Sequence, residues 1–248
     1  MVAEDKVLTS FGADMSGERA LICIPHAGGG AATFAAWARP LRSTATVWAA
    51  RLPGRESLIR EEPLQTVEQM AEILARALER LPASELTLFG YCSGALIAYE
   101  LAHRLTAGGD ERVKRLVVGS RLAPAPDGAS QSPQSEITRT ETLSFLRRMG
   151  GTDSEILNNP EYVSLIAPAL ISDAAAALRY RPPASRDKYS IPIVAIGGML
   201  DVNVREADLM TWKACTSGSF SIHQFAGDHF FLITQLEEVI EFFVGLMR

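Results

Sequence analysis

Short apolar runs alternate along the chain with longer stretches in which apolar residues recur every three or four positions. A strand that is covered on both faces carries apolar residues at successive positions, so the short runs predict buried strands. The longer stretches predict amphipathic helices, whose apolar stripe faces the core. Strands are predicted at Ala20–Pro25, Thr46–Leu52, Leu86–Gly90, Val113–Gly119, Ile193–Gly197 and Phe220–Phe225. Helices are predicted at Phe34–Leu41, Val67–Leu81 after a Thr66 cap, Gly94–Thr106, Val204–Lys213 and Leu236–Met247.

This alternation of strands and helices predicts an α/β fold with a mostly parallel central sheet and helices on both faces. With 248 residues, of which 47% are hydrophobic, the chain has the size of one such domain. We therefore expect a single domain over residues 1–248. Residues 1–18 are expected to form a frayed start or an edge strand.

The composition changes after the fourth predicted strand, where Ala123–Ser135 is rich in Pro, Ser, Ala and Gly. Two helical segments follow, at Thr140–Met149 and Pro160–Tyr180. Sites in open α/β sheets lie at the carboxyl ends of the strands, so this insertion, about residues 124–185, is predicted to be a helical lid. The alternative is a pair of packing helices with no gating role.

Composition and charge narrow the range of partners. A formal net charge of −5, with 21% charged residues, gives no general attraction for nucleic acid. The start Met1–Lys6 is polar and acidic, and no apolar run approaches membrane-spanning length, so we expect no signal peptide and no membrane partner. Three cysteines without metal-ligand spacing indicate free thiols in a reducing cytoplasm. We expect a monomer that uses no metal or cofactor of its own.

The segment Gly90-Tyr91-Cys92-Ser93-Gly94 joins a predicted strand to a predicted helix. It has the G-x-S-x-G form of a nucleophile elbow, with cysteine in the serine position, and a Cβ at either glycine is expected to collide with its neighbours. A helix N-terminus stabilises a thiolate, so Cys92 is the predicted nucleophile. Ser93 competes for this role but is one residue out of register, and its N–H is expected to serve an oxyanion hole. The other thiols, Cys23 and Cys215, are interpreted as structural.

A base and an acid follow later in the chain. His229 comes after the last predicted strand, and Asp201 comes after the strand before it. The order nucleophile, acid, histidine is that of the α/β-hydrolase fold, which predicts His229 as the base and Asp201 as the group that orients it. The competing residues are His26, His103 and His223 for the base, and Asp208 and Asp228 for the acid.

A glycine-rich segment, His26-Ala27-Gly28-Gly29-Gly30, follows the first predicted strand. A phosphate cradle is one interpretation, but no Gly-Lys-Ser/Thr follows the glycines. A loop that donates the Ala27 N–H to an oxyanion, together with the Ser93 N–H, fits better. We assign His26, Gly28 and Tyr91 to substrate binding.

Several segments carry a family resemblance that spans almost the whole chain: Pro25–Gly30, Leu52–Glu56, the elbow, Gly150–Thr152, Ala167–Leu170 with Asp173, and Gly227–Leu232. They resemble the type II thioesterases that serve polyketide synthases and nonribosomal peptide synthetases. The resemblance implies an α/β-hydrolase with a helical lid, which hydrolyses stalled or wrong acyl groups attached through phosphopantetheine to an acyl or peptidyl carrier protein. Carried over position by position, it implies a triad of Cys92, Asp201 and His229, with oxyanion donors at Ala27 and Ser93.

The elbow departs from the family's usual Gly-His-Ser-Met-Gly, because Tyr91 replaces the histidine and Cys92 replaces the serine. With Cys92 as nucleophile, one thioester replaces another, and this step is close to thermoneutral. Three hypotheses follow: hydrolysis of carrier-bound acyl, aminoacyl or peptidyl thioesters; transfer of the group between carriers through a Cys92 thioester; and a non-catalytic carrier-binding module. The arginines that are candidates to meet an acidic carrier, with solvated lid charges as the alternative, are Arg147, Arg148, Arg179, Arg181 and Arg186.

Overall fold

The computed structural model describes residues 6–11, 18–125 and 159–248. Its strands are β1 (Leu8–Ser10), β2 (Arg19–Ile24), β3 (Thr46–Ala50), β4 (Glu85–Tyr91), β5 (Val113–Gly119), β6 (Ile193–Gly198) and β7 (Phe220–Phe225). Its α-helices are α1 (Ala38–Leu41), α2 (Val67–Leu78), α3 (Ser93–Ala107), α6 (Pro160–Arg179), α7 (Glu206–Met210), α8 (Phe231–Thr234) and α9 (Leu236–Leu246). Short 3-10 helices are η2 (Ala31–Trp37), η3 (Glu56–Leu58) and η4 (Thr211–Cys215). The predicted helix Thr140–Met149 and most of the predicted lid lie outside the described residues, so the lid stays a prediction.

The strands form one sheet in the order β1-β3-β2-β4-β5-β6-β7. β1 pairs antiparallel with β3 at the edge, and every other pairing is parallel. The mostly parallel sheet is therefore confirmed, as is the edge strand near the start of the chain. In the sheet, β3 lies on one side of β2, and the next strand in sequence, β4, lies on the other side of β2. Loops after β2 and β4 diverge at such a switch point, and open α/β sheets bind ligands there.

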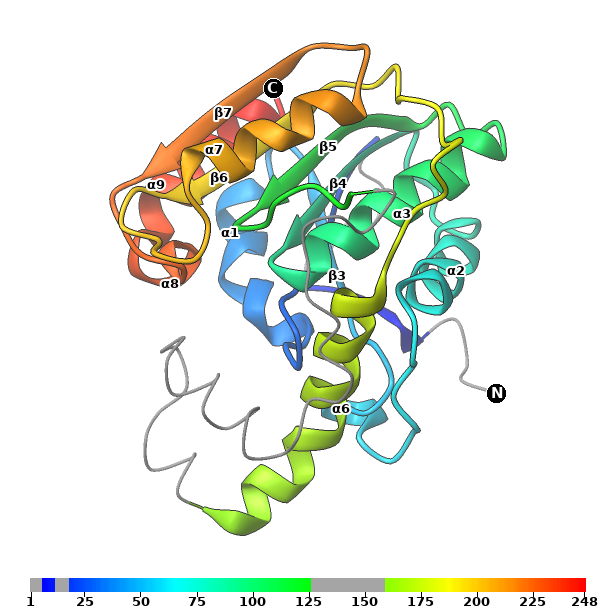
Figure 1. The fold of residues 1–248 in the computed structure, drawn as a ribbon, viewed down its shortest axis with the longest axis vertical. Coiled ribbons are helices and arrows are strands. Elements are labelled where there is room, and N and C mark those ends of the chain that lie inside the picture. The colour runs from blue at the N-terminus through cyan, green and yellow to red at the C-terminus, as the bar shows by residue number, and fades with distance from the viewer. Residues whose placement is uncertain (1–5, 12–17, 126–158) are drawn as a thin grey trace.

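Helices cover both faces of the sheet, and β2 shows why its apolar run is continuous (Figure 1). Ala20, Ile22 and Ile24 belong to the core cluster that includes α2 and α3. Leu21 and Cys23 belong to the second cluster, with η2, α1 and α9. Because successive side chains of a strand point to opposite faces, a strand between two layers of helices needs apolar residues at every position.

Most of the predicted elements agree with the structure to within a residue or two, but two predicted helices are interrupted. The segment predicted as Phe34–Leu41 divides equally between the end of η2 and α1. The buried residues of η2, Ala31, Phe34 and Trp37, recur every three positions, the period of a 3-10 helix. The segment predicted as Val204–Lys213 divides into α7 and η4. Within the part of the chain that the structure describes, no helix is both long and apolar enough to cross a bilayer.

Candidate active site

Cys92 stands in a strained turn between β4 and α3. Its backbone has φ 55° and ψ −117°, a conformation that L-residues rarely adopt outside functional sites. A Cβ on Gly90 would collide with the Gly94 carbonyl at the start of α3, and a Cβ on Gly94 would collide with the carbonyl of Ile24 in β2. The steric prediction for both glycines is therefore confirmed. The turn leaves the Cys92 side chain half-buried at the carboxyl edge of the sheet.

His229 and Asp201 meet at the same edge. Asp201 follows β6, His229 follows β7, and Nδ1 of the imidazole lies 2.7 Å from Oδ2 of the carboxylate. The other carboxylate oxygen accepts the backbone N–H groups of Asn203 at 2.9 Å and Val204 at 3.1 Å. Asp201 is thus held from both sides, which fixes the orientation of the imidazole ring.

The imidazole of His229 also approaches the Cys92 thiol. The contact falls outside ordinary hydrogen-bond geometry, since the buried Nε2 atom has no hydrogen-bond partner among the residues described. It is nevertheless close enough for each group to change the pKa of the other. Catalytic hydrogen bonds in ligand-free enzymes are often long and tighten when substrate binds.

The pKa values of these groups shift toward an ion pair. Burial raises the pKa of the Cys92 thiol, but His229, Arg121 and the Ser93 N–H lower it by more, so it lies below the ordinary thiol value. Burial lowers the pKa of His229, whereas Asp201 and Cys92 raise it by more, to about 9. Both shifts favour the ion pair of a thiolate and an imidazolium over the pair of neutral groups.

The competing histidines and carboxylates lie elsewhere or have other partners. His103 lies on α3 near Tyr189, and His223 lies on β7 stacked on Phe242. The carboxylate of Asp228 accepts the Phe230 N–H at 2.8 Å, and that of Asp208 accepts the Arg205 N–H at 2.9 Å.

Ser93 is the first residue of α3 and is 4% exposed, with a buried hydroxyl. The geometry thus brings together Cys92, His229 and Asp201, and their catalytic roles stay a prediction.

The glycine-rich loop after β2 lies against the elbow, because Ile24 pairs with Gly90 across the two strands. In this loop the Gly29 N–H donates to the His26 carbonyl at 2.9 Å, and the Gly28 N–H donates to Asp173 at 2.8 Å. Within the described part of the chain, no acceptor is found for the Ala27 N–H, and its predicted role as an oxyanion donor stays a prediction.

Tyr91 and His26, both predicted to bind substrate, are packed close to the candidate triad. The Tyr91 ring contacts the rings of His26 and His229, with centroids 6.1 and 5.7 Å apart. Tyr91 is only 1% exposed, so in this conformation its ring supports the two histidines from within the core. Burial, and then the charge on His229, lower the pKa of His26 to about 4, so His26 is neutral at pH 7.

Sequence reasoning missed Arg121, whose charge lowers the pKa of Cys92. Arg121 follows β5, the strand beside β4, and its position after that strand is the signal that could have identified it. Its backbone carbonyl accepts the Trp212 indole N–H at 2.7 Å.

One of the arginines proposed to meet a carrier is not available. Arg186 forms an ion pair with Glu100 at 2.7 Å, and both side chains are less than a tenth exposed. A buried guanidinium that is already paired cannot face an acidic partner, so that suggestion is corrected. Arg179 and Arg181 donate to backbone carbonyls, while Arg147 and Arg148 lie outside the described residues.

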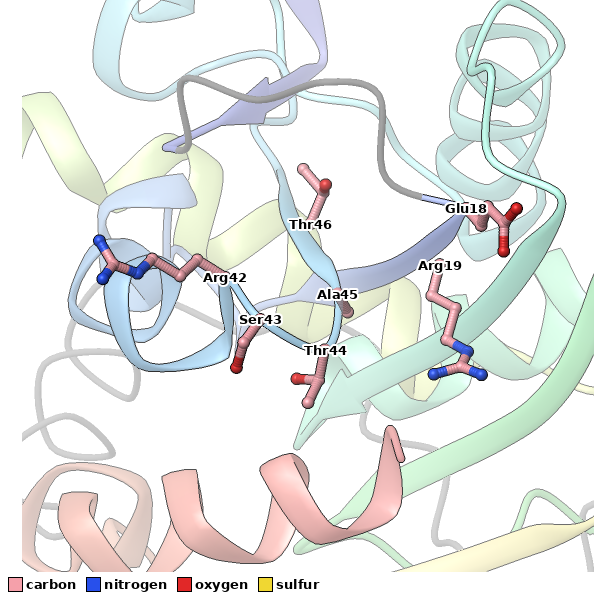
Figure 2. A pocket seen from close by; sticks show the side chains of 7 residues that line it. All are labelled: Glu18, Arg19, Arg42, Ser43, Thr44, Ala45 and Thr46. Carbon is pink, nitrogen blue, oxygen red and sulfur yellow. The ribbon is translucent and has the colours of Figure 1, made fainter.

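A polar hollow of about 280 Å³ lies at the other end of the sheet (Figure 2). Arg19 stands at the start of β2, and Arg42, Ser43 and Thr44 come from the turn before β3. Both strands begin at this hollow and run away from it, so it is separate from the site at the carboxyl edge.

Alkylation tests the ion pair directly. Since only the thiolate attacks iodoacetamide, Cys92 is expected to be labelled near pH 7, well below the pKa of about 8.5 of a free cysteine. Labelling should decline only as pH falls through the lowered pKa of Cys92, and the imidazolium partner should persist up to about pH 9. Cys215 provides an internal control, because burial raises its pKa to about 11. Peptide mass spectrometry across a pH series makes the measurement, and equal labelling of Cys92 and Cys215 at neutral pH would contradict an activated thiol.

Comparison with known proteins gives a consistent result. The family model of the thioesterase domain matches residues 19–246. The gramicidin S biosynthesis protein GrsT of Aneurinibacillus migulanus is 32% identical over 228 residues, which cover 92% of this chain and 88% of that protein. Thioesterase PikA5 of Streptomyces venezuelae is 33% identical over 225 residues, covering 88% of this chain and 77% of that protein.

Solved structures agree in fold over nearly the whole chain. The type II thioesterase BorB from the borrelidin biosynthetic cluster superposes with a TM-score of 0.85 and 30% identity, covering 97% of both chains. The RedJ thioesterase from the prodiginine pathway of Streptomyces coelicolor superposes with a TM-score of 0.83 and 29% identity, covering 94% of this chain and 87% of that chain.

Proposed function

This chain belongs to the thioesterase domain family, and from that premise we propose that it is a type II thioesterase that removes groups from carrier proteins in polyketide or nonribosomal peptide biosynthesis. Its substrates are acyl, aminoacyl or peptidyl thioesters of phosphopantetheine. One observation carries the proposal: Cys92 in its strained turn lies beside His229, whose imidazole is 2.7 Å from Asp201. A nucleophile, a base and an orienting carboxylate are the parts that acyl transfer needs.

In the first half of the reaction, the Cys92 thiolate attacks the thioester carbonyl. Negative charge that develops on the carbonyl oxygen is stabilised by the N–H groups of Ala27 and Ser93, which act as the oxyanion hole. When the tetrahedral intermediate collapses, the bond to the pantetheine sulfur breaks, and that sulfur leaves with a proton from His229. The acyl group is then held on Cys92 as a new thioester.

In the second half, water replaces the pantetheine thiol. The neutral imidazole of His229 takes a proton from water as it attacks the Cys92 thioester, while Asp201 stabilises the imidazolium that forms. Collapse of this second intermediate releases the carboxylic acid and returns Cys92 to the thiolate. The proposed chemistry uses only side chains and backbone groups of this chain.

Hydrolysis can be measured with a carrier protein loaded with an acyl group on its phosphopantetheine arm. The protein should release free acid at a rate well above that of the loaded carrier alone, with multiple turnovers per molecule. Acid release at the enzyme-independent rate would contradict the proposal. Comparing short acyl, aminoacyl and peptidyl loads then identifies the substrate class.

Transfer is the second candidate function, because Cys92 would hold the acyl group as a thioester, which reacts readily with thiols as well as with water. The same assay decides between the two when a second, empty carrier is added. Appearance of the acyl group on the empty carrier faster than free acid would assign transfer as the main reaction. If the protein is a non-catalytic binding module, neither free acid nor acylated second carrier should form above background, and Cys92 should be unreactive toward iodoacetamide.

A further inference from the structure

Arg55 and Asp173 form a buried ion pair that joins distant parts of the chain. Arg55 lies between β3 and η3, while Asp173 lies on α6. Both nitrogens of the guanidinium fork contact the carboxylate, Nη1 to Oδ2 at 2.6 Å and Nη2 to Oδ1 at 2.9 Å. The side chains are only 6% and 2% exposed. Bidentate pairs of this kind hold two segments in one relative orientation, and a buried charge left alone is costly.

The same pair holds the glycine-rich loop after β2. Oδ2 of Asp173 accepts the Gly28 N–H at 2.8 Å, and Nη1 of Arg55 donates to the Gly29 carbonyl at 3.1 Å. Gly28 has φ +73°, and a Cβ built on it would come within 3.0 Å of the Leu170 side chain. Leu170 and Asp173 are one turn apart on α6, so this helix contacts the loop through both packing and a hydrogen bond.

These contacts determine where the Ala27 N–H points. The peptide between His26 and Ala27 is planar and trans, so the His26 carbonyl and the Ala27 N–H point in opposite directions. The carbonyl accepts the Gly29 N–H at 2.9 Å, which fixes that peptide plane. Gly29 is held in turn by Arg55, and Gly28 is held by Asp173. The hydrogen bond that orients the Ala27 N–H is thus connected to the ion pair through Gly29 and Gly28.

We propose that Arg55 and Asp173 are positioning residues, which aim the Ala27 N–H at the oxyanion and tie that donor to α6. This inference rests on the proposed function, because an oxyanion forms only if Cys92 attacks an acyl carbonyl. Neither side chain touches the reacting atoms. Their effect passes through Gly28 and Gly29.

Two reactions of the Cys92 thiol distinguish a misaligned oxyanion donor from a general loss of Cys92 reactivity. Attack on a thioester develops an oxyanion, whereas alkylation by iodoacetamide occurs at a saturated carbon and develops none. Removing one oxyanion donor costs about 10²- to 10³-fold in kcat. A donor that is misaligned but still present should cost less, so we expect Asp173→Asn to lower kcat for thioester hydrolysis by roughly 10- to 100-fold. Its KM and the alkylation rate of Cys92 should stay close to those of the wild-type protein.

The chain offers a matched control in the buried pair of Arg186 and Glu100, which lies away from the loop. It has similar burial, with side chains 7% and 6% exposed, and Nη2 of Arg186 lies 2.7 Å from Oε2 of Glu100. Glu100→Gln should lower the melting temperature as Asp173→Asn does, but it should leave kcat unchanged. If alkylation and hydrolysis fall together in Asp173→Asn, or if hydrolysis does not fall, the positioning role is wrong.

Amide hydrogen exchange gives a readout that does not depend on turnover. Exchange in the peptide that covers residues 24–31 should be faster in Asp173→Asn than in the wild-type protein, and unchanged in Glu100→Gln. Unaltered exchange in Asp173→Asn would overturn the inference. Absence of thioester turnover in the wild-type protein would instead count against the proposed function, so the two failures are distinguishable.

Discussion

Replacing Cys92 with alanine is expected to lower acyl-thioester hydrolysis by about 10³-fold or more, because loss of the nucleophile of a catalytic triad removes most of the rate enhancement. A factor of 10³ corresponds to about 4 kcal/mol of transition-state stabilisation. Alanine keeps the Cβ atom of Cys92 and lacks only the thiol. The substitution therefore removes the nucleophile and does not change which residues surround the strained backbone at φ 55°. The measurement is free acid released from a loaded carrier, with the melting temperature as a check on folding.

Cys215→Ala provides the matched control for this substitution. Cys215 ends η4, packs against the core on the α2 and α3 side, and has a raised pKa. Its loss should leave the hydrolysis rate within about twofold of the wild-type rate, because the Cys215 side chain packs against that core and not at the candidate triad. If Cys92→Ala keeps a substantial part of the wild-type rate, another group is the nucleophile, and the mechanism proposed above is wrong.

Replacing Asp201 with asparagine is expected to lower hydrolysis by roughly 10²- to 10⁴-fold, as in other triads whose carboxylate is replaced by an amide. The side-chain carbonyl of asparagine still accepts the N–H groups of Asn203 and Val204, so the loop after β6 keeps its shape. The NH₂ group then faces Nδ1 of His229 and stabilises the tautomer that carries its proton on Nε2. That tautomer cannot act as the base toward Cys92 or water.

A shift in the pKa of His229 accompanies this loss and can be measured separately. Asp201 raises the pKa of His229, so the imidazole of Asp201→Asn should titrate below about 9. NMR of the His229 side chain follows the titration directly. The control is Asp228→Asn, since Asp228 lies beside His229 in sequence but bonds the Phe230 N–H instead. Comparable losses in the two variants would contradict the assignment of Asp201 as the orienting acid.

The sheet and the elbow could be predicted from the sequence because the physical constraints on them are local. A strand between two layers of helices carries apolar residues at successive positions, and β2 lies within one residue of the bounds that this pattern predicts. The glycines Gly90 and Gly94 can be interpreted from the sequence alone, because a sharp turn between a strand and a helix leaves no room for a Cβ. The Thr66 cap was likewise local, and its hydroxyl accepts the Gln69 N–H at 3.1 Å.

What the sequence pattern could not supply depends on packing between distant segments. Arg55 and Asp173 are separated by 118 positions, and no periodicity links them. In η2, Phe34 and Trp37 pack against Phe89 of β4, with ring centroids 5.9 and 5.6 Å away, and this contact joins segments that are far apart in the sequence. Arg186 is one of several arginines in its part of the sequence, and only the fold brings it to Glu100. Such contacts become visible once the chain is assembled in three dimensions.

The most direct test of the central claim is the mass of the peptide that contains Cys92, recovered after rapid mixing with an acyl-loaded carrier and an acid quench. This peptide should gain the mass of the acyl group on the sulfur of Cys92, and the adduct should decay as free acid appears. Release of acid without an adduct on Cys92, or with the acyl group on Ser93, would contradict the central claim.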